Sequence, residues 1–195
     1  MIIGVTGNSG SGKTEVSNKL KEKLGCYLVI ADEIVKELSQ KGNKYYDEIV
    51  KAFGTSILNK LKEIDRPKLA KKIYNNSEKR EILNSITNIY IVEEIKKQAN
   101  RVSNEGTVII DVPRLIECGL SKICNVIISV IADTEIKIDR ICKRDNISRE
   151  IAESRLNIQP NDQFYIDNSD YIINTNNGVL DEAIDSVIEG IKCNI

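Results

Sequence analysis

Hydrophobic positions along the chain fall into short apolar runs separated by longer segments with helical spacing. The apolar runs lie at residues 1–6, 26–30, 107–113, 125–130 and 171–174. Runs that are continuous rather than alternating are typical of strands buried on both faces of a sheet. Because helical segments separate these runs, the pattern predicts an α/β fold with a five-stranded parallel sheet covered by helices.

Apolar residues spaced by three or four predict the intervening helices. These helices are expected at 15–22, 34–38, 45–53, 57–61, 67–73, 82–102, 135–145, 149–159 and 179–191. In the segment 82–102 the spacing forms a stripe that we expect to pack in a core. The stripe consists of Ile82, Ile86, Ile89, Val92, Ile95, Ala99 and Val102. No convincing strand occurs between residues 41 and 106, so a helical block interrupts the sheet.

Residues that begin and end helices occur at several of the expected boundaries. Gly25 predicts the stop of the first helix, and Asp65 before Arg66-Pro67 predicts a cap followed by an early helical proline. Ser148 has capping character. Asp32 leaves two readings open. It lies either at the carboxyl end of a strand, where ligands bind in open α/β sheets, or at the N-cap of a helix beginning at Glu33.

The first strand runs directly into Gly7-Asn8-Ser9-Gly10-Ser11-Gly12-Lys13-Thr14, which has the pattern G-x-x-x-x-G-K-[ST] between a strand and a helix. Glycines let such a loop turn its backbone N–H groups inward, and the helix N-terminus adds further N–H donors. Lys13 can reach the β- and γ-phosphates, and the Thr14 hydroxyl can bind Mg²⁺. The loop therefore predicts binding of a nucleoside triphosphate.

Composition narrows the class of protein. The chain has 195 residues, 28 basic and 29 acidic residues, and a net charge of −1. A chain of this length can form one globular domain without a metal or disulfide to stabilise it. Because charge is balanced and well mixed, no general field attracts nucleic acid. The chain contains no histidine, which excludes histidine-based acid–base catalysis and histidine metal sites.

The five cysteines show no C-x-x-C spacing, and their number is odd. This pattern favours a reducing, cytoplasmic setting. No secretory leader pattern precedes the first strand, and no apolar run approaches the length of a membrane span. We therefore expect a soluble protein without a membrane partner, either a monomer or a weak homo-oligomer.

Two further features can be interpreted either as parts of a functional site or as ordinary structural features. Asp111 ends the apolar run 107–113, where a carboxylate can hold Mg²⁺ or its waters, but an acid there can equally serve as a cap or turn residue. Arg140, Lys143 and Arg144 lie on one predicted helix, either as a solvated basic face or as part of a lid that clamps ATP.

Further short motifs occur in a fixed order along nearly the whole chain. They are Val5-Thr6-Gly7 through Gly12-Lys13, Asp32-Glu33 after Ala31, Ile49 through Gly54, Asp65-Arg66 with Leu69, Ile86-Thr87, Asp111-Val112-Pro113 with Glu117 and Gly119, Arg140 with Arg144-Asp145, Gln159, and Asp170-Tyr171. In this combination the chain resembles the dephospho-CoA kinase family, of the nucleoside-monophosphate-kinase-like P-loop group. Such ordered matches are far more specific than the phosphate loop alone.

The resemblance implies a fold and a division of the chain. The fold is a P-loop NTPase three-layer sandwich with a five-stranded parallel sheet, a helical substrate-binding insertion and a small helical lid. All of it forms a single kinase domain, residues 1–195. Its core comprises residues 1–40, 106–139 and 168–195, with the insertion at about 41–105 and the lid at about 140–167.

The resemblance also implies transfer of the ATP γ-phosphoryl group to the ribose 3′-hydroxyl of dephospho-CoA, with Mg²⁺ as cofactor. Lys13, Asp32 and Arg140 would be catalytic, with Asp32 accepting the proton of the hydroxyl. The nucleotide would be bound by Gly10, Ser11, Gly12, Lys13, Thr14, Glu15, Arg144 and Arg155. The acceptor would be bound by Asp32, Arg66 and Asp111. Thr14 would bind the metal, with Asp111 as a second candidate.

The chain departs from the family pattern at several positions. Glu15 stands where the family usually has threonine, and Asn88-Ile89 replaces His-Pro. Arg114-Leu115-Ile116 follows Asp111-Val112-Pro113 in place of two leucines and a phenylalanine. Tyr165 and Ile166 replace basic residues that commonly occur about six positions after the lid glutamine. These departures bear on substrate affinity and on the identity of the acceptor.

Three alternatives remain at this stage. One is a P-loop kinase of another small-molecule acceptor, and another is an ATP-binding paralogue that has lost catalysis. The third is a GTPase-type switch, but the Asn-Lys-x-Asp run that such switches use for guanine is absent where Asn precedes Lys, at Asn18, Asn43 and Asn59.

Overall fold

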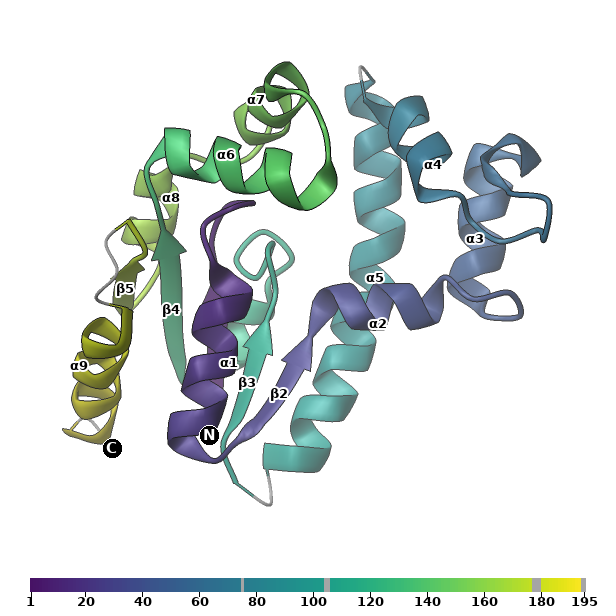
Figure 1. The fold of residues 1–195 in the computed structure, drawn as a ribbon. Helices are drawn as coiled ribbons and strands as arrows, with labels where there is room; N and C mark the ends of the chain where they lie inside the picture. The colour runs from purple at the N-terminus through teal and green to yellow at the C-terminus, as the bar shows by residue number, and fades with distance from the viewer. Residues whose placement is uncertain (75, 104–105, 177–179, 194–195) are drawn as a thin grey trace. The chain divides into compact units, whose positions relative to one another are not determined.

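The computed structural model describes residues 1–74, 76–103, 106–176 and 180–193 (Figure 1). Its strands are β1 Ile2–Thr6, β2 Tyr27–Ile30, β3 Val108–Asp111, β4 Val126–Ile131 and β5 Tyr171–Asn174. Its helices are α1 Lys13–Leu24, α2 Ala31–Leu38, α3 Lys44–Phe53, α4 Arg66–Ile73, α5 Ser77–Ser103, α6 Thr134–Asp145, α7 Arg149–Asn157, α8 Asp162–Asp167 and α9 Leu180–Cys193. Short 3₁₀ turns lie at Thr55–Ile57 and Leu120–Ile123. The chain divides into two compact units, Met1–Val29 with Gln98–Ile195, and Ile30–Lys97.

The five strands form one sheet in the order β2-β3-β1-β4-β5. β1 pairs in parallel with β3 and with β4, and β4 pairs in parallel with β5. The register sets Val5 beside Asp111 and Thr6 beside Ser129, so the carboxyl ends of β1, β3 and β4 meet at one edge. The predicted five-stranded parallel sheet is confirmed.

Alternating side chains of β1 face opposite sides of the sheet. Ile3 and Val5 belong to a core that also contains Val16 and Leu20 of α1 and Ile184 of α9. Figure 1 shows α1 lying along this face and α9 beside β5. This packing fixes α1 against the strand that precedes the phosphate loop, and thereby fixes the start of the helix.

The opposite face of the sheet is covered by other segments. A Cβ atom on Gly4 would lie 2.6 Å from a methyl group of Leu115 and 2.8 Å from the sulfur of Cys124, so the chain after β3 packs directly on β1. On the same side, the Ser129 hydroxyl of β4 donates a hydrogen bond of 3.1 Å to the carbonyl of Tyr165 in α8. Helices and turns thus cover both faces, as the continuous apolar strands predicted.

The unit Ile30–Lys97 has a core of its own. Its buried members are Tyr45, Ile49, Phe53, Ile57 and Leu69, with partly buried apolar residues around them. The ring of Tyr45 meets that of Tyr90 edge to face with centroids 5.7 Å apart. Asp65 caps α4 by accepting a 3.0 Å hydrogen bond from the Lys68 amide, as predicted. The helical block is therefore a compact unit with its own hydrophobic core and not an extended linker.

Two sequence predictions in this unit are wrong. Residues 58–61 are not helical, because the Asn59 side chain accepts hydrogen bonds from the amides of Leu61 and Glu63 and holds a turn. On α5, Ile82 is 39% exposed and Ile89 is 63% exposed. Ile86 packs on the unit's core as expected, beside Leu83 and Tyr90, and Ile95 and Ala99 of the expected stripe are fully buried, so the stripe prediction is wrong only at the two exposed isoleucines.

Other boundaries differ in smaller ways. α8 was not expected, and Ser148 stands at the N-cap of α7 without a side-chain capping hydrogen bond. Gly25 ends α1 in the left-handed conformation, as predicted. Val179, the expected start of the last helix, lies outside the described residues. No helix in the described ranges combines the length and apolar character needed to cross a membrane.

Candidate active site

The loop Gly7–Gly12 joins β1 to α1 and passes close to neighbouring backbone. A Cβ atom on Gly7 would lie 2.2 Å from the carbonyl oxygen of Val130, and one on Gly10 would lie 2.5 Å from that of Lys137. Both residues also have positive φ angles, 139° and 76°. Only glycine tolerates both conditions, so these two glycines shape the loop. The resulting strand–loop–helix geometry is the one that the sequence motif predicted.

The first helical residue lies over this loop. The Lys13 ammonium donates a 2.8 Å hydrogen bond to the carbonyl oxygen of Asn8. Inside the loop, the Ser11 hydroxyl is buried and has no hydrogen-bond partner among the residues that the structure describes. A buried hydroxyl of this kind is a donor that an anionic ligand can satisfy. The loop therefore combines an ammonium, a hydroxyl and a helix N-terminus, all suited to phosphate.

Residues far along the chain hold the loop in place. The Gln159 side chain accepts a 2.9 Å hydrogen bond from the Ser9 amide and donates a 3.0 Å bond to the Ser9 hydroxyl. The Asn8 amide group donates to the Pro160 carbonyl at 3.1 Å and to Asp162 at 3.4 Å. Gln159 was recognised as part of the family pattern but was not predicted as a site residue.

An ion pair between a buried lysine and a half-buried aspartate lies behind the same loop. The Lys137 ammonium contacts both carboxylate oxygens of Asp162 at 2.8 and 2.9 Å, and its side chain is only 4% exposed. Asp162 in turn accepts from Asn8, so the ion pair connects α6 and α8 with the loop. Neither residue was predicted, because nothing in the local pattern marks a lysine whose partner lies 25 positions away.

Arg140 reaches the loop from α6. Its guanidinium donates to the Gly10 carbonyl at 3.2 Å, to the Thr175 hydroxyl at 2.8 Å and to the Thr175 carbonyl at 2.9 Å. The Thr175 hydroxyl donates onward to the Ser11 carbonyl at 2.7 Å. Arg140 is thus at the loop, while Thr175, which directly follows β5, was not predicted. We call Lys137, Arg140, Gln159, Asp162 and Thr175 the loop brace.

Asp111 ends β3 beside the first turns of α1. Its carboxylate accepts a 3.1 Å hydrogen bond from the Ser17 hydroxyl, and the residue is only 4% exposed. Thr14 lies one helical turn before Ser17, at the exposed start of the helix. A carboxylate and a hydroxyl are oxygen ligands that suit Mg²⁺, which usually takes only one or two protein ligands together with phosphates and waters. In the described part of the chain, no group of three or more His, Cys, Asp or Glu could hold a metal.

Arg144 and Arg155 are gathered around one carboxylate. Arg144 contacts Asp145 through two hydrogen bonds, the shorter at 2.8 Å, and Arg155 contacts it at 2.5 Å. Hydrogen bonding to Arg144, followed by its charge and by the contacts with Arg155, lowers the pKa of Asp145 below its ordinary value. The structure therefore brings Arg144 and Arg155 together with Asp145, at the junction of α6 and α7.

This arrangement predicts a pH-dependent contribution of Asp145 to stability. A carboxyl whose pKa is lowered by folding stabilises the protein above its unfolded pKa of about 3.9, and the stabilisation is lost as pH falls through the folded pKa. The melting temperature of wild type should exceed that of Asp145→Asn at neutral pH, and the difference should shrink as pH falls below about 4. Thermal melts across pH, with the exposed Asp139→Asn as control, would check this. A pH-independent difference would contradict it.

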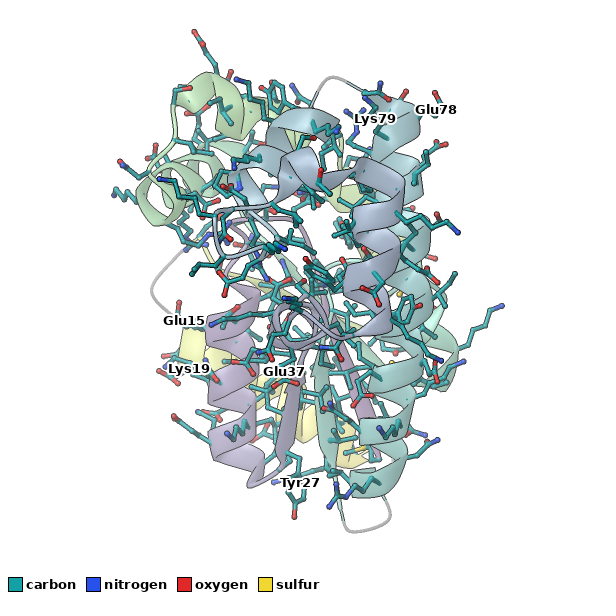
Figure 2. The ribbon with its side chains drawn as sticks, turned by 90° about the vertical axis from the view of Figure 1, so that its right-hand side faces the viewer. Glu15, Lys19, Tyr27, Glu37, Glu78 and Lys79 are labelled. Atoms are coloured by element: carbon teal, nitrogen blue, oxygen red, sulfur yellow. The ribbon has the colours of Figure 1, made fainter. Side chains whose placement is uncertain are left out.

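Three further predicted site residues are exposed on helices. Asp32 and Arg66 belong to the unit Ile30–Lys97, where both side chains are exposed. α2 begins at Ala31 with Ile30 as its N-cap, so the capping interpretation of Asp32 is wrong and the residue lies in the first helical turn directly after β2. Glu15 is exposed on α1, on the same side as Lys19, as Figure 2 shows.

Comparison with known proteins places these features in a family. The family model described as dephospho-CoA kinase matches residues 1–181. A curated dephospho-CoA kinase of Fusobacterium nucleatum is 39% identical over 181 residues, covering 93% of this chain and 92% of that protein. One from Bacillus cereus is 34% identical over 182 residues, covering 92% and 90%. A solved dephospho-CoA kinase from Campylobacter jejuni superposes with a TM-score of 0.67 at 27% identity, covering 100% of this chain and 98% of that one. The chain belongs to the dephospho-CoA kinase family.

Proposed function

We propose that this protein transfers the γ-phosphoryl group of ATP to the ribose 3′-hydroxyl of dephospho-CoA, giving CoA and ADP in the last step of coenzyme A synthesis. The observation that carries the proposal is the phosphate loop, with Lys13 over it and the loop brace behind it, in a chain that matches the family over residues 1–181. The nearly complete match supports the same acceptor as in the relatives.

Phosphoryl transfer asks the protein mainly to position two substrates and to neutralise charge. Residues Gly10 through Thr14 would hold the triphosphate by their N–H groups. Lys13 would leave the Asn8 carbonyl, which it contacts at 2.8 Å, for the phosphate oxygens. The loop brace keeps the backbone of the loop fixed, so that the N–H donors are already oriented when ATP binds.

The oxygen atoms of the Thr14 and Asp111 side chains are suitable ligands for a magnesium ion. Thr14 and Asp111 would hold it or its waters, and Mg²⁺ bound there would offset charge on the β- and γ-phosphates. Ser17 already orients the Asp111 carboxylate through its 3.1 Å hydrogen bond.

The helical block, residues about 41–105, would bind the acceptor, with Arg66 as one of its cations. Asp32 would orient the 3′-hydroxyl and accept its proton. Residues about 140–167 would form the lid, where Arg144 and Arg155 could exchange their contacts with Asp145 for phosphate oxygens of ATP.

The five cysteines are free thiols, which supports our proposal that the enzyme acts in the cytoplasm.

Arg140→Lys should lower kcat on the order of 10²-fold, with a smaller change in KM for ATP. A lysine cannot reproduce the three hydrogen bonds of the guanidinium to Gly10 and Thr175, nor paired bonds to a phosphoryl group in the transition state. Steady-state kinetics on the variant would check this, with Lys143→Gln on the exposed side of α6 as control. Unaltered kcat would reduce Arg140 to a structural contact.

The position of the transferred phosphate tests the proposed chemistry. Phosphorus NMR and mass spectrometry of the product should show one added phosphate on the ribose 3′-oxygen of dephospho-CoA. A panel of other nucleoside and alcohol acceptors, assayed under the same conditions, should turn over much more slowly. Phosphate on another oxygen, or faster turnover of another acceptor, would refute the assignment.

A further inference from the structure

Arg114 is a cation at the carboxyl edge of the sheet, beside the phosphate loop. It follows β3 by three residues, and the carbonyl of the preceding Pro113 accepts a 3.2 Å hydrogen bond from the hydroxyl of Thr6, the last residue of β1. The Arg114 guanidinium thus adds a positive charge next to the phosphate loop.

The only charged partner of Arg114 in the described part of the chain is Glu117, and their contact is loose. The Nε atom of Arg114 lies 3.9 Å from a carboxylate oxygen of Glu117, which is too long for a hydrogen bond. Both this Nε atom and the other carboxylate oxygen are buried, and neither has a hydrogen-bond partner among the described residues. The pair therefore has a buried donor and a buried acceptor without hydrogen-bond partners, and leaving such groups unpaired costs free energy.

Three other candidate arginines of this unit have hydrogen-bond partners. Arg140 is bound to Gly10 and Thr175, and Arg144 and Arg155 are bound to Asp145. Arg114, by contrast, has a side chain that is 43% exposed and makes no hydrogen bond to any described residue. Its guanidinium is thus accessible and retains several N–H donors for a ligand.

The strand order indicates which substrate the Arg114 guanidinium can reach. The loop brace approaches the phosphate loop from the side of β4 and β5, because Thr175 follows β5 and Tyr165 of α8 bonds to β4. β3 lies on the other side of β1. Arg114 therefore follows the strand next to β2, which leads directly into α2 and Asp32, the proposed contact of the 3′-hydroxyl, and its guanidinium is available to the second substrate.

Tyr165 of α8 lies near this pair. It is buried, and burial together with the nearby charge of Glu117 raises the pKa of its hydroxyl. Glu117 contacts Arg114, and not a residue of α8, as its cation.

We propose that Arg114, oriented by Glu117, binds phosphate oxygens of the acceptor and is a specificity-determining residue of this enzyme. The inference rests on the proposed function, whose acceptor carries a pyrophosphate group. A guanidinium can donate two parallel hydrogen bonds to such a group, and a carboxylate behind it limits its rotation. Glu117 is a positioning residue and does not itself contact the acceptor.

Arg114→Leu tests the inference directly. KM for dephospho-CoA should rise by about tenfold or more, the loss expected for charge-assisted hydrogen bonds, while kcat and KM for ATP stay within about twofold. Arg114→Lys should give an intermediate KM, because an ammonium keeps the charge without the paired geometry. Lys122→Leu removes an exposed cation from the same segment and should leave all constants unchanged.

Glu117→Gln separates positioning from binding. Alone it should raise KM for dephospho-CoA by a smaller factor, about threefold, and combined with Arg114→Leu it should add nothing, because the two residues act as a unit. The double variant also avoids leaving the Glu117 carboxylate without a cation, so it serves as the folding control for Arg114→Leu. Thermal melts would establish that each variant is folded.

An unchanged KM for dephospho-CoA in folded Arg114→Leu would overturn the inference, and so would a rise in KM for ATP instead. Additive effects of Arg114→Leu and Glu117→Gln would overturn the positioning role. These results differ from a failure of the proposed function, which would appear as a wild-type enzyme that neither binds dephospho-CoA by calorimetry nor phosphorylates it.

Discussion

Lys13→Ala should reduce kcat on the order of 10²- to 10³-fold while the protein stays folded. The ammonium lies over the phosphate loop, 2.8 Å from the Asn8 carbonyl, and is proposed to exchange this contact for phosphate oxygens of ATP. Negative charge shifts toward the bridge between the β- and γ-phosphates as the transfer proceeds, so the loss should appear in kcat more than in KM for ATP. Steady-state kinetics and circular dichroism would measure both effects.

Lys21→Ala is the matched control, because it removes an exposed ammonium from the same helix away from the loop. It should leave kcat and ATP binding unchanged. A folded Lys13→Ala enzyme with activity near that of wild type would show that the loop does not hold the reacting phosphates.

Asp32→Asn should lower kcat by at least about 10²-fold, the lower range for general acid–base groups. The substitution keeps the shape of the side chain but removes the proton acceptor for the 3′-hydroxyl. ATP affinity should change little, because Asp32 is proposed to contact only the acceptor. Since Ile30 and not Asp32 is the N-cap of α2, lost helix capping does not offer another explanation for the loss of activity.

Glu33→Gln is the control for this variant, since Glu33 is the next residue of α2 and is equally exposed. It should retain activity. If Asp32→Asn has unchanged kcat in the presence of saturating dephospho-CoA, then another group accepts the proton and the assignment of Asp32 fails.

The phosphate loop and the sheet could be predicted because their determinants are local. Gly7 through Thr14 carry the turn, the donors and the helix start within one motif, and continuous apolar strands can only be buried on both faces. Asp111 was also predictable, because the end of a buried parallel strand fixes where its last side chain lies. Thr175 obeys the same rule after β5 and could have been found by it.

Apart from Arg140, the rest of the loop brace could not be predicted as site residues, because its contacts join distant positions. Gln159 is 150 residues from Ser9, and Lys137 is 25 residues from Asp162. On α6, Lys137 carries no local signal, and only the packing of α6 against Gly10 and the contact with Asp162 show its place behind the loop. Side-chain spacing within a helix cannot reveal such an environment.

Errors in the helical unit have a similar origin. The apolar spacing along α5 is compatible with more than one stripe, and the core around Tyr45 contains Leu83 and Tyr90 together with the expected Ile86, while Ile82 and Ile89 are exposed. In the turn before Ile64, the hydrogen bonds of one side chain, Asn59, outweighed the helical spacing of the apolar residues around it.

The dependence of ADP release on the acceptor tests the central claim most directly. Wild-type protein with ATP and Mg²⁺ should release ADP slowly, and addition of dephospho-CoA should raise the initial rate by orders of magnitude in a coupled assay. Lys13→Ala should abolish most of this increase. An ADP release rate that is the same with and without dephospho-CoA would contradict the assignment of this chain as an active dephospho-CoA kinase.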